Sequence, residues 1–158
     1  MKNTKFLIQS AVIAAVYTAL TLLLMPFSYG FLQIRVSEAL TILPFFTPAA
    51  IPGLFVGCLL TNLLGPYGFA DMVFGSAATL IAAMGSYMLK RIPIMVPLPP
   101  VLANGIVIGA MLYFVYGVQI PLYASILWVS AGELVACYGL GYPLLRYLKK
   151  YKNIFELH

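Results

Sequence analysis

The stretch FLQIRVSEALTILPFF, residues 31–46, decides the predicted fold because it places charge beside long apolar runs. Arg35 and Glu38 form an opposite-charge pair three residues apart, and side chains at that spacing meet on one face of a helix. Charge at the edge of a membrane core is costly unless it is paired or used. Two interpretations stay open: an interfacial salt bridge that fixes where a helix begins, or a pair that contacts a ligand.

Composition places the chain in the membrane. Of its 158 residues, 63% are apolar and 8% are charged, whereas soluble domains are about 25% charged. The mean hydropathy is +1.00. The net charge of +5 does not indicate nucleic-acid binding, because the basic residues lie at the ends of apolar runs, where membrane topology explains them. We therefore expect an all-α integral membrane protein of the cell membrane, with one transmembrane domain over residues 1–158.

Six membrane passes are expected, over residues 5–27, 37–46, 49–64, 69–89, 101–116 and 122–145. The second is too short to span the bilayer, and Pro44, Pro48 and Pro52 interrupt the chain there. We predict a short or broken helix that must be covered by protein. Six passes put both termini in the cytoplasm with most basic residues. A five-pass alternative fuses residues 37–64 into one kinked span.

Two stripes of small residues predict close helix contacts, because dispersion forces drive helix association in lipid. Ala11, Ala15 and Ala19 repeat at four-residue spacing on the first helix, and this stripe either docks a partner or packs internally. The third segment carries a similar stripe, Gly53, Gly57, Thr61 and Gly65.

Glu133 is the most informative single residue, because a carboxyl inside a membrane span indicates a functional site. The alternative is a protonated carboxyl bonded to a neighbouring helix. Asn104, Trp128 and Tyr138 lie in the same last spans and suit a small-molecule site, although aromatic residues also collect at membrane interfaces. Asp71 could join a site, but its position after Gly68 favours a helix N-cap.

Missing motifs exclude several functions. The chain has no phosphate-binding G-x-x-x-x-G-K-[ST] motif, and its single histidine is His158. We therefore expect no ATP binding by this chain, no histidine metal site, no cofactor and no enzymatic activity. Cys58 and Cys137 lie in apolar runs without metal-ligand spacing, so buried free thiols are expected.

Taken together, these residues resemble the QueT family, proposed queuosine-precursor carriers among the substrate-binding (S) components of energy-coupling-factor (ECF) transporters. The most specific match is QIRVSEALTILPFF, residues 33–46. Weaker matches are GLFVGCLLTN, residues 53–62, the helix start at Asp71, and the pair Gly132-Glu133.

The resemblance implies six helices and a pocket built mainly from the last three. It also implies a membrane-embedded T component and two ATPase subunits as partners, with Ala11, Ala15 and Ala19 docking the T component. The implied substrate is a 7-deazaguanine such as preQ1, a flat base with an aminomethyl cation.

The chemistry of that substrate suggests a role for each candidate residue. Glu133 would accept the guanine edge and Asn104 would take a further polar edge. Trp128 or Tyr138 would stack on the ring. Glu38 or Asp71 would meet the ammonium, with Arg35 holding Glu38. Alternatives are an S component for a folate-like or thiamine-like vitamin, a solitary proton-coupled transporter, and a structural subunit without a ligand.

Overall fold

The helices follow the predicted apolar runs closely. A computed structural model describes residues 2–24, 35–65 and 68–151, and these residues form α-helices joined by short 3-10 and π segments, labelled η. The elements are α1 (Lys2–Leu23), η1 (Val36–Phe45), α3 (Ala50–Leu64), η2 (Asp71–Gly75), α4 (Ser76–Met88), η3 (Pro93–Met95), α5 (Leu98–Phe114), α6 (Leu122–Leu134), η4 (Val135–Gly141) and α7 (Tyr142–Leu148).

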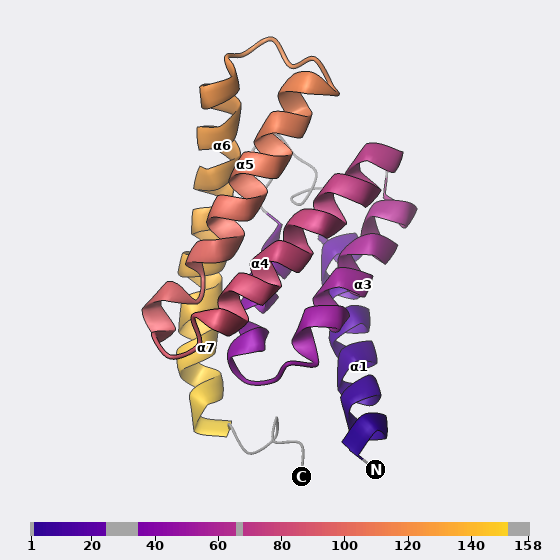
Figure 1. Ribbon diagram of the computed structural model, residues 1–158, viewed down its shortest axis with the longest axis vertical. Coiled ribbons are helices and arrows are strands. Elements are labelled where there is room, and N and C mark those ends of the chain that lie inside the picture. Colours follow the sequence, from indigo (N-terminus) through magenta and orange to yellow (C-terminus); the bar gives the residue numbers. More distant parts are fainter. Residues whose placement is uncertain (1, 25–34, 66–67, 152–158) are drawn as a thin grey trace.

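The long helices run up and down one bundle (Figure 1). The chain rises through α1, α3 and α5, and it descends through α4 and through the continuous run of α6, η4 and α7. The start of α1 and the end of α7 lie at the same end of the bundle, the lower end in Figure 1.

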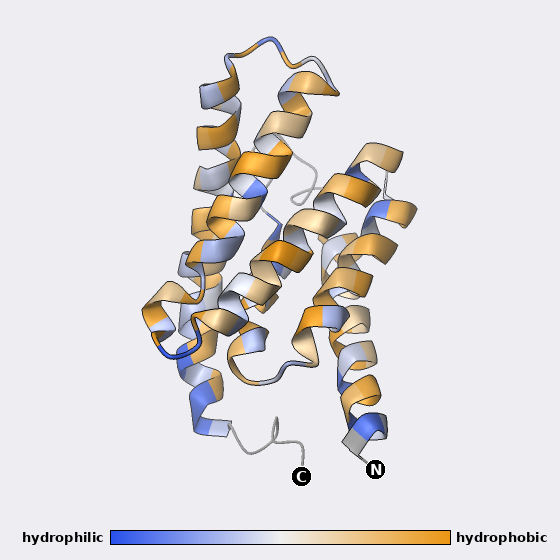
Figure 2. Ribbon diagram, in the orientation of Figure 1, coloured by the Kyte–Doolittle hydropathy of each residue, from blue (hydrophilic) through white to orange (hydrophobic). Residues whose placement is uncertain are grey.

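Within the described residues, three helical runs are long and apolar enough to cross a membrane: Asn3–Leu23, Pro93–Phe114 and Leu122–Tyr151. Hydrophobic residues make up most of the helices, and hydrophilic residues are most frequent at the lower end of the bundle (Figure 2). The chain is therefore a multi-pass membrane protein. The total of six passes stays a prediction, because η1 and α3 are shorter apolar helices.

The predicted short helix is confirmed as η1, which has 3-10 geometry and contains Pro44. Ten residues at the 3-10 rise give about 20 Å, against a hydrocarbon thickness of about 30 Å. All of its residues from Ser37 to Pro44 are buried. Contacts with α1, α3, α4, η4 and α7 cover it. A turn over residues 46–49 separates it from α3, which favours the six-pass arrangement over one fused span.

Glycines bring α3 against α1, as the small-residue stripe predicted. A Cβ at Gly57 would lie 3.0 Å from the Ala14 carbonyl oxygen, so the two backbones are nearly in contact. Ser10 donates a hydrogen bond to the Ala49 carbonyl at 2.9 Å, and Thr18 donates one to the Gly57 carbonyl at 3.1 Å. Close approach lets these polar side chains satisfy backbone groups across the helix pair.

The alanine stripe of α1 is on the opposite face. Ala11, Ala15 and Ala19 are exposed, whereas Ala14 and Tyr17 point into the bundle. The stripe therefore does not pack against the described part of the chain.

Two local expectations were wrong. The fifth pass, predicted to begin at residue 101, begins earlier: α5 starts at Leu98, with Pro99 and Pro100 in its first turn, where prolines are tolerated. Asp71 is not an N-cap: the helix already begins at residue 69, and the Asp71 carboxylate instead accepts a hydrogen bond from the Tyr116 hydroxyl.

The contact between α5 and α6 gives a direct test of the packing. A Cβ at Gly109 would lie 2.6 Å from the Ile126 Cα, so Gly109→Ala must push two backbones apart. We expect a loss of about 1–3 kcal/mol, seen as a lower thermal unfolding temperature in detergent. Gly139→Ala is the matched control, because its new methyl group would meet only Val135 Cγ1 at 3.9 Å. Equal unfolding temperatures for the two variants would contradict this packing.

Candidate functional site

Four polar residues from distant parts of the sequence meet inside the bundle: Arg35, Glu38, Asn104 and Glu133. Glu38 is fully buried, and Asn104 and Glu133 are each 4% exposed. The Asn104 side chain is within hydrogen-bonding reach of both carboxyl groups, and the Arg35 charge acts on both. We call these four residues the central polar cluster. Each of these residues was predicted from the sequence as a site candidate, but their proximity in space was not predicted.

Glu38 is held by η1 in the middle of the bundle. The Tyr17 hydroxyl of α1 donates a hydrogen bond to its Oε1. Thr41 donates a hydrogen bond to the Glu38 carbonyl at 2.6 Å. This bond fixes the backbone of the helical turn that follows Glu38. The second carboxyl oxygen, Oε2, is buried and accepts no hydrogen bond of ordinary geometry from the described residues. A buried polar atom without a partner is costly, so this oxygen is suited to a ligand donor.

Glu133 lies where α6 passes into the π segment η4. π segments inside helices occur frequently at functional sites, because they turn side chains away from the regular spacing. The Cys137 thiol lies 3.6 Å from Glu133 Oε2 and also 3.6 Å from the Glu38 carbonyl oxygen. Cys137 therefore links the two acidic residues, one from η1 and one from α6.

Arg35 joins the cluster to a second set of polar groups on α3 and α4. Its Nη1 lies 3.9 Å from the position that a Cβ would take at Gly75, and Asn62 Nδ2 lies 2.7 Å from the same point. Asn62 donates a hydrogen bond to the Asp71 carbonyl at 2.9 Å. Asn62 Oδ1 and Ser76 Oγ are also buried without a partner among the described residues.

The remaining predicted residues are not brought into the cluster. Asp71 is buried, but Tyr116 engages its carboxylate. Tyr138 donates a hydrogen bond to the Ile94 carbonyl at 3.0 Å, which ties η4 to η3 near the lower end. Trp128 is 48% exposed. Residues three or four apart on a helix share a face, and both Ser125 and Gly132 are buried. Trp128 therefore lies at the edge of the inward face of α6.

Sequence reasoning missed Tyr17 as a site residue. The available signal was a single tyrosine on the inward side of the first span, because a buried tyrosine hydroxyl needs a partner. It treated Cys137 only as a buried thiol, because its contacts with the Glu133 carboxyl group and the Glu38 backbone carbonyl depend on the fold.

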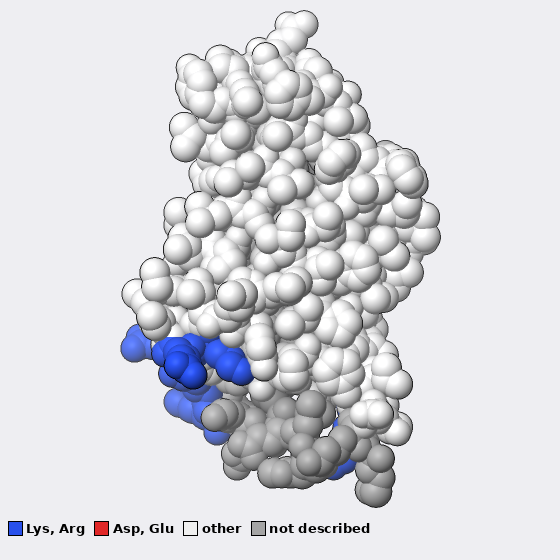
Figure 3. Space-filling view, in the orientation of Figure 1, with Lys and Arg blue, Asp and Glu red and all other residues white. Residues whose placement is uncertain are grey.

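Charge separates the interior from the surface. The three acidic residues in the described ranges, Glu38, Asp71 and Glu133, are all buried. On the face shown in Figure 3, Lys and Arg gather at the lower end and no acidic group is visible. One surface pocket lies at that end, and a groove of about 550 Å³ lies between the ends of α5 and α6 at the upper end. Neither is lined by the central polar cluster.

The cluster can bind donors and a positive charge. Two carboxyl groups lie within the electrostatic influence of one guanidinium, so the cluster would carry a net charge of −1 with all three groups ionised, and a cationic ligand would balance that charge. Among the described residues, no group of His, Cys, Asp and Glu has the makeup of a metal site. Buried carboxyl and amide oxygens suit an organic ligand with several N–H donors.

Comparison with known proteins connects this arrangement to a family. A segment of 85 residues is 35% identical to the protein named queuosine precursor transporter QueT from Lactococcus lactis subsp. cremoris (strain MG1363), and it covers 51% of this chain and 50% of that relative. The match thus spans about half the length of the relative. No solved structure matches this chain. The sequence model of the QueT transporter family matches residues 7–150, which is most of the chain, and the protein therefore belongs to the QueT transporter family.

Proposed function

We propose that this protein binds a queuosine precursor of the 7-deazaguanine class, such as preQ1, and acts as the substrate-binding component of an ECF transporter. Membership of the QueT transporter family and the name of the Lactococcus relative support the substrate class. The observation that carries the proposal is the meeting of Glu38 and Glu133 in the bundle interior, beside Asn104 and Arg35.

Glu133 is the proposed acceptor of the guanine edge. That edge presents a ring N–H and an amino group side by side, and a carboxylate accepts such a donor pair with both oxygens. Asn104 is within reach of the same carboxyl group and can bond a further polar atom of the base. Trp128, at the edge of the inward face, is the proposed stacking partner; the Tyr138 hydroxyl is already bonded to Ile94.

Glu38 is the proposed partner of the aminomethyl ammonium. Its Oε2 is buried and accepts no hydrogen bond of ordinary geometry from the described residues, so it is suited to accept one from an ammonium. Asp71 fits this role less well, because Tyr116 already donates to its carboxylate. Arg35 is proposed to keep Glu38 ionised and in place, since the Arg35 charge acts on the Glu38 carboxyl.

Glu133→Gln tests the proposal most simply. The amide keeps the shape of the side chain but replaces one acceptor oxygen with a donor, which repels the guanine edge. We expect preQ1 affinity to fall by about thirtyfold or more in a calorimetric titration of the purified protein. Asp71→Asn is the matched control and should bind preQ1 nearly as well as the unmodified protein. Near-normal affinity of Glu133→Gln, with wild-type expression, would contradict the assignment.

Glu38→Gln separates the ammonium contact from the guanine contact. Removing this charge should weaken preQ1 binding by about tenfold or more while leaving guanine binding almost unchanged, because guanine has no ammonium. Competition between the two compounds on one preparation measures the ratio directly. If both affinities fall equally, Glu38 supports the site but does not contact the ammonium.

The exposed stripe Ala11, Ala15 and Ala19 is the proposed docking face for the T component, with two ATPase subunits completing the transporter. Small side chains on an unpacked helix face let another helix approach closely.

Ala15→Trp should abolish co-purification with the T and ATPase subunits without changing preQ1 affinity. Ala77→Trp places the same bulk at an exposed alanine of α4 and should leave assembly intact. Loss of assembly in both variants, or in neither, would argue against docking by the stripe. Substrate uptake by the chain alone would contradict the ECF role itself.

A further inference from the structure

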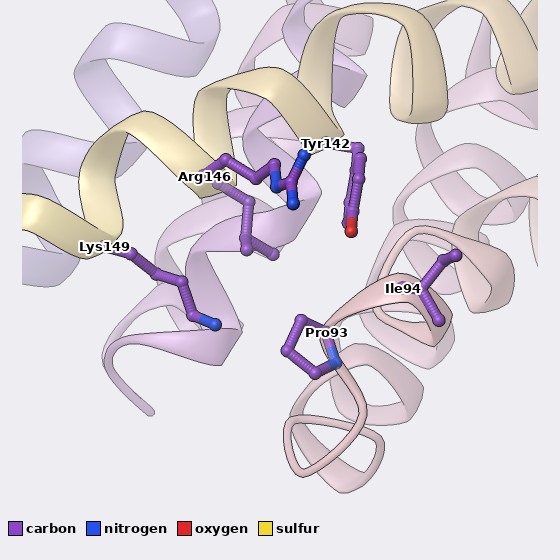
Figure 4. Close-up of a pocket in the computed structure, with 6 residues that line it drawn as sticks. Pro93, Ile94, Tyr142, Arg146 and Lys149 are labelled. Carbon is purple, nitrogen blue, oxygen red and sulfur yellow. The ribbon is translucent and has the colours of Figure 1, made fainter.

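A second polar site lies at the lower end of the bundle, away from the central polar cluster. A pocket of about 280 Å³ between η3 and α7 is lined by Pro93, Ile94, Tyr142, Leu145, Arg146 and Lys149. In the close-up, the Arg146 and Lys149 side chains extend from α7 into the space facing Pro93 and Ile94 (Figure 4). The predicted substrate site uses none of the residues that line this pocket.

Aromatic rings hold both cations without neutralising them. The Arg146 guanidinium lies 5.7 Å from the centre of the Tyr142 ring, and the Lys149 ammonium lies 5.4 Å from the centre of the Phe45 ring. Such contacts orient a cation and leave its charge available. The acidic residues in the described ranges are buried elsewhere, so the pocket has a positive potential.

The opposite wall is fixed by hydrogen bonds from the bundle. Tyr138 donates to the Ile94 carbonyl at 3.0 Å, and Ser86 donates to the Val96 carbonyl at 2.7 Å. Leu145 is fully buried beneath the pocket. The pocket is therefore preorganised, which lowers the entropy cost of binding a ligand there.

Ile94 lines the pocket, and Ile92 and Met95 are its exposed neighbours in the sequence; we call these three residues the apolar rim. Ile92, Ile94 and Met95 are 49%, 58% and 38% exposed, and the membrane-spanning run Pro93–Phe114 begins at this point. A phosphate group alone would use the two cations but not this rim. A phospholipid would use both, with its phosphate on the cations and an acyl chain along the rim.

We propose that the pocket between η3 and α7 binds the headgroup of an anionic phospholipid, with Arg146 and Lys149 contacting the phosphate and Ile94 contacting the first part of an acyl chain. The pocket is large enough for a headgroup but not for a whole lipid.

The test measures retained lipid by native mass spectrometry of the purified protein, using phosphatidylglycerol and phosphatidylcholine as probes. The unmodified protein should retain phosphatidylglycerol preferentially. Arg146→Gln/Lys149→Gln should lower its affinity by about thirtyfold, which corresponds to two basic groups at a membrane surface. Lys90→Gln/Arg91→Gln removes the same charge from the turn before η3, outside the pocket, and should retain the lipid. Arg146→Lys/Lys149→Arg keeps the charge and should also retain it.

Three results would overturn the proposal. Equal loss in both glutamine double variants would mean that the general charge of this end, not the pocket, attracts the lipid. Binding of inorganic phosphate without preferential retention of phosphatidylglycerol would mean that the pocket is an ion site without a lipid contact. Unchanged lipid retention in Arg146→Gln/Lys149→Gln, together with lost assembly with the T and ATPase subunits, would assign the pocket to a protein partner.

Discussion

The fold depends on covering η1. This helix is too short to cross the bilayer, contains a proline and carries a carboxyl group in its first turn, so neither its backbone nor Glu38 can face lipid. The bundle resolves this by burying η1 from Ser37 to Pro44 among the longer helices. Small residues make that possible, because Gly53 and Gly57 bring α3 onto α1, and Gly141 brings η4 onto η1, where an added Cβ would lie 3.1 Å from the Ala39 carbonyl oxygen.

Burying Glu38 also creates the site. When both groups are ionised, the carboxylates of Glu38 and Glu133 repel each other, which destabilises the bundle unless other groups compensate. Arg35 and Asn104 supply part of that compensation, and the Tyr17 hydroxyl supplies another part. In our account a cationic ligand supplies the rest. Ligand binding should therefore stabilise the bundle as well as deliver the substrate, because it relieves a repulsion built into the interior.

The sequence predicted the elements better than their contacts. Apolar run lengths and prolines located η1, α3 and the long C-terminal helix, and scarcity of charge identified Arg35, Glu38 and Glu133 as unusual. The meeting of Glu38 with Glu133 depends on how η1 and α6 are rotated, and hydropathy does not specify rotation in helices that are apolar on most faces. The same uncertainty hid the roles of Tyr17 and Cys137. Asp71 was misassigned because local capping rules do not include a hydroxyl from Tyr116, 45 residues away.

The central claim is that the buried acids select a cationic deazaguanine, and titration of the unmodified protein alone in detergent tests it most directly. Three compounds are compared by calorimetry: preQ1, guanine and an unrelated vitamin such as thiamine. We expect tight binding of preQ1, weaker binding of guanine and no binding of the unrelated vitamin. Equal affinity for preQ1 and guanine would contradict the role given to Glu38, and the absence of binding to either would contradict the substrate assignment as a whole.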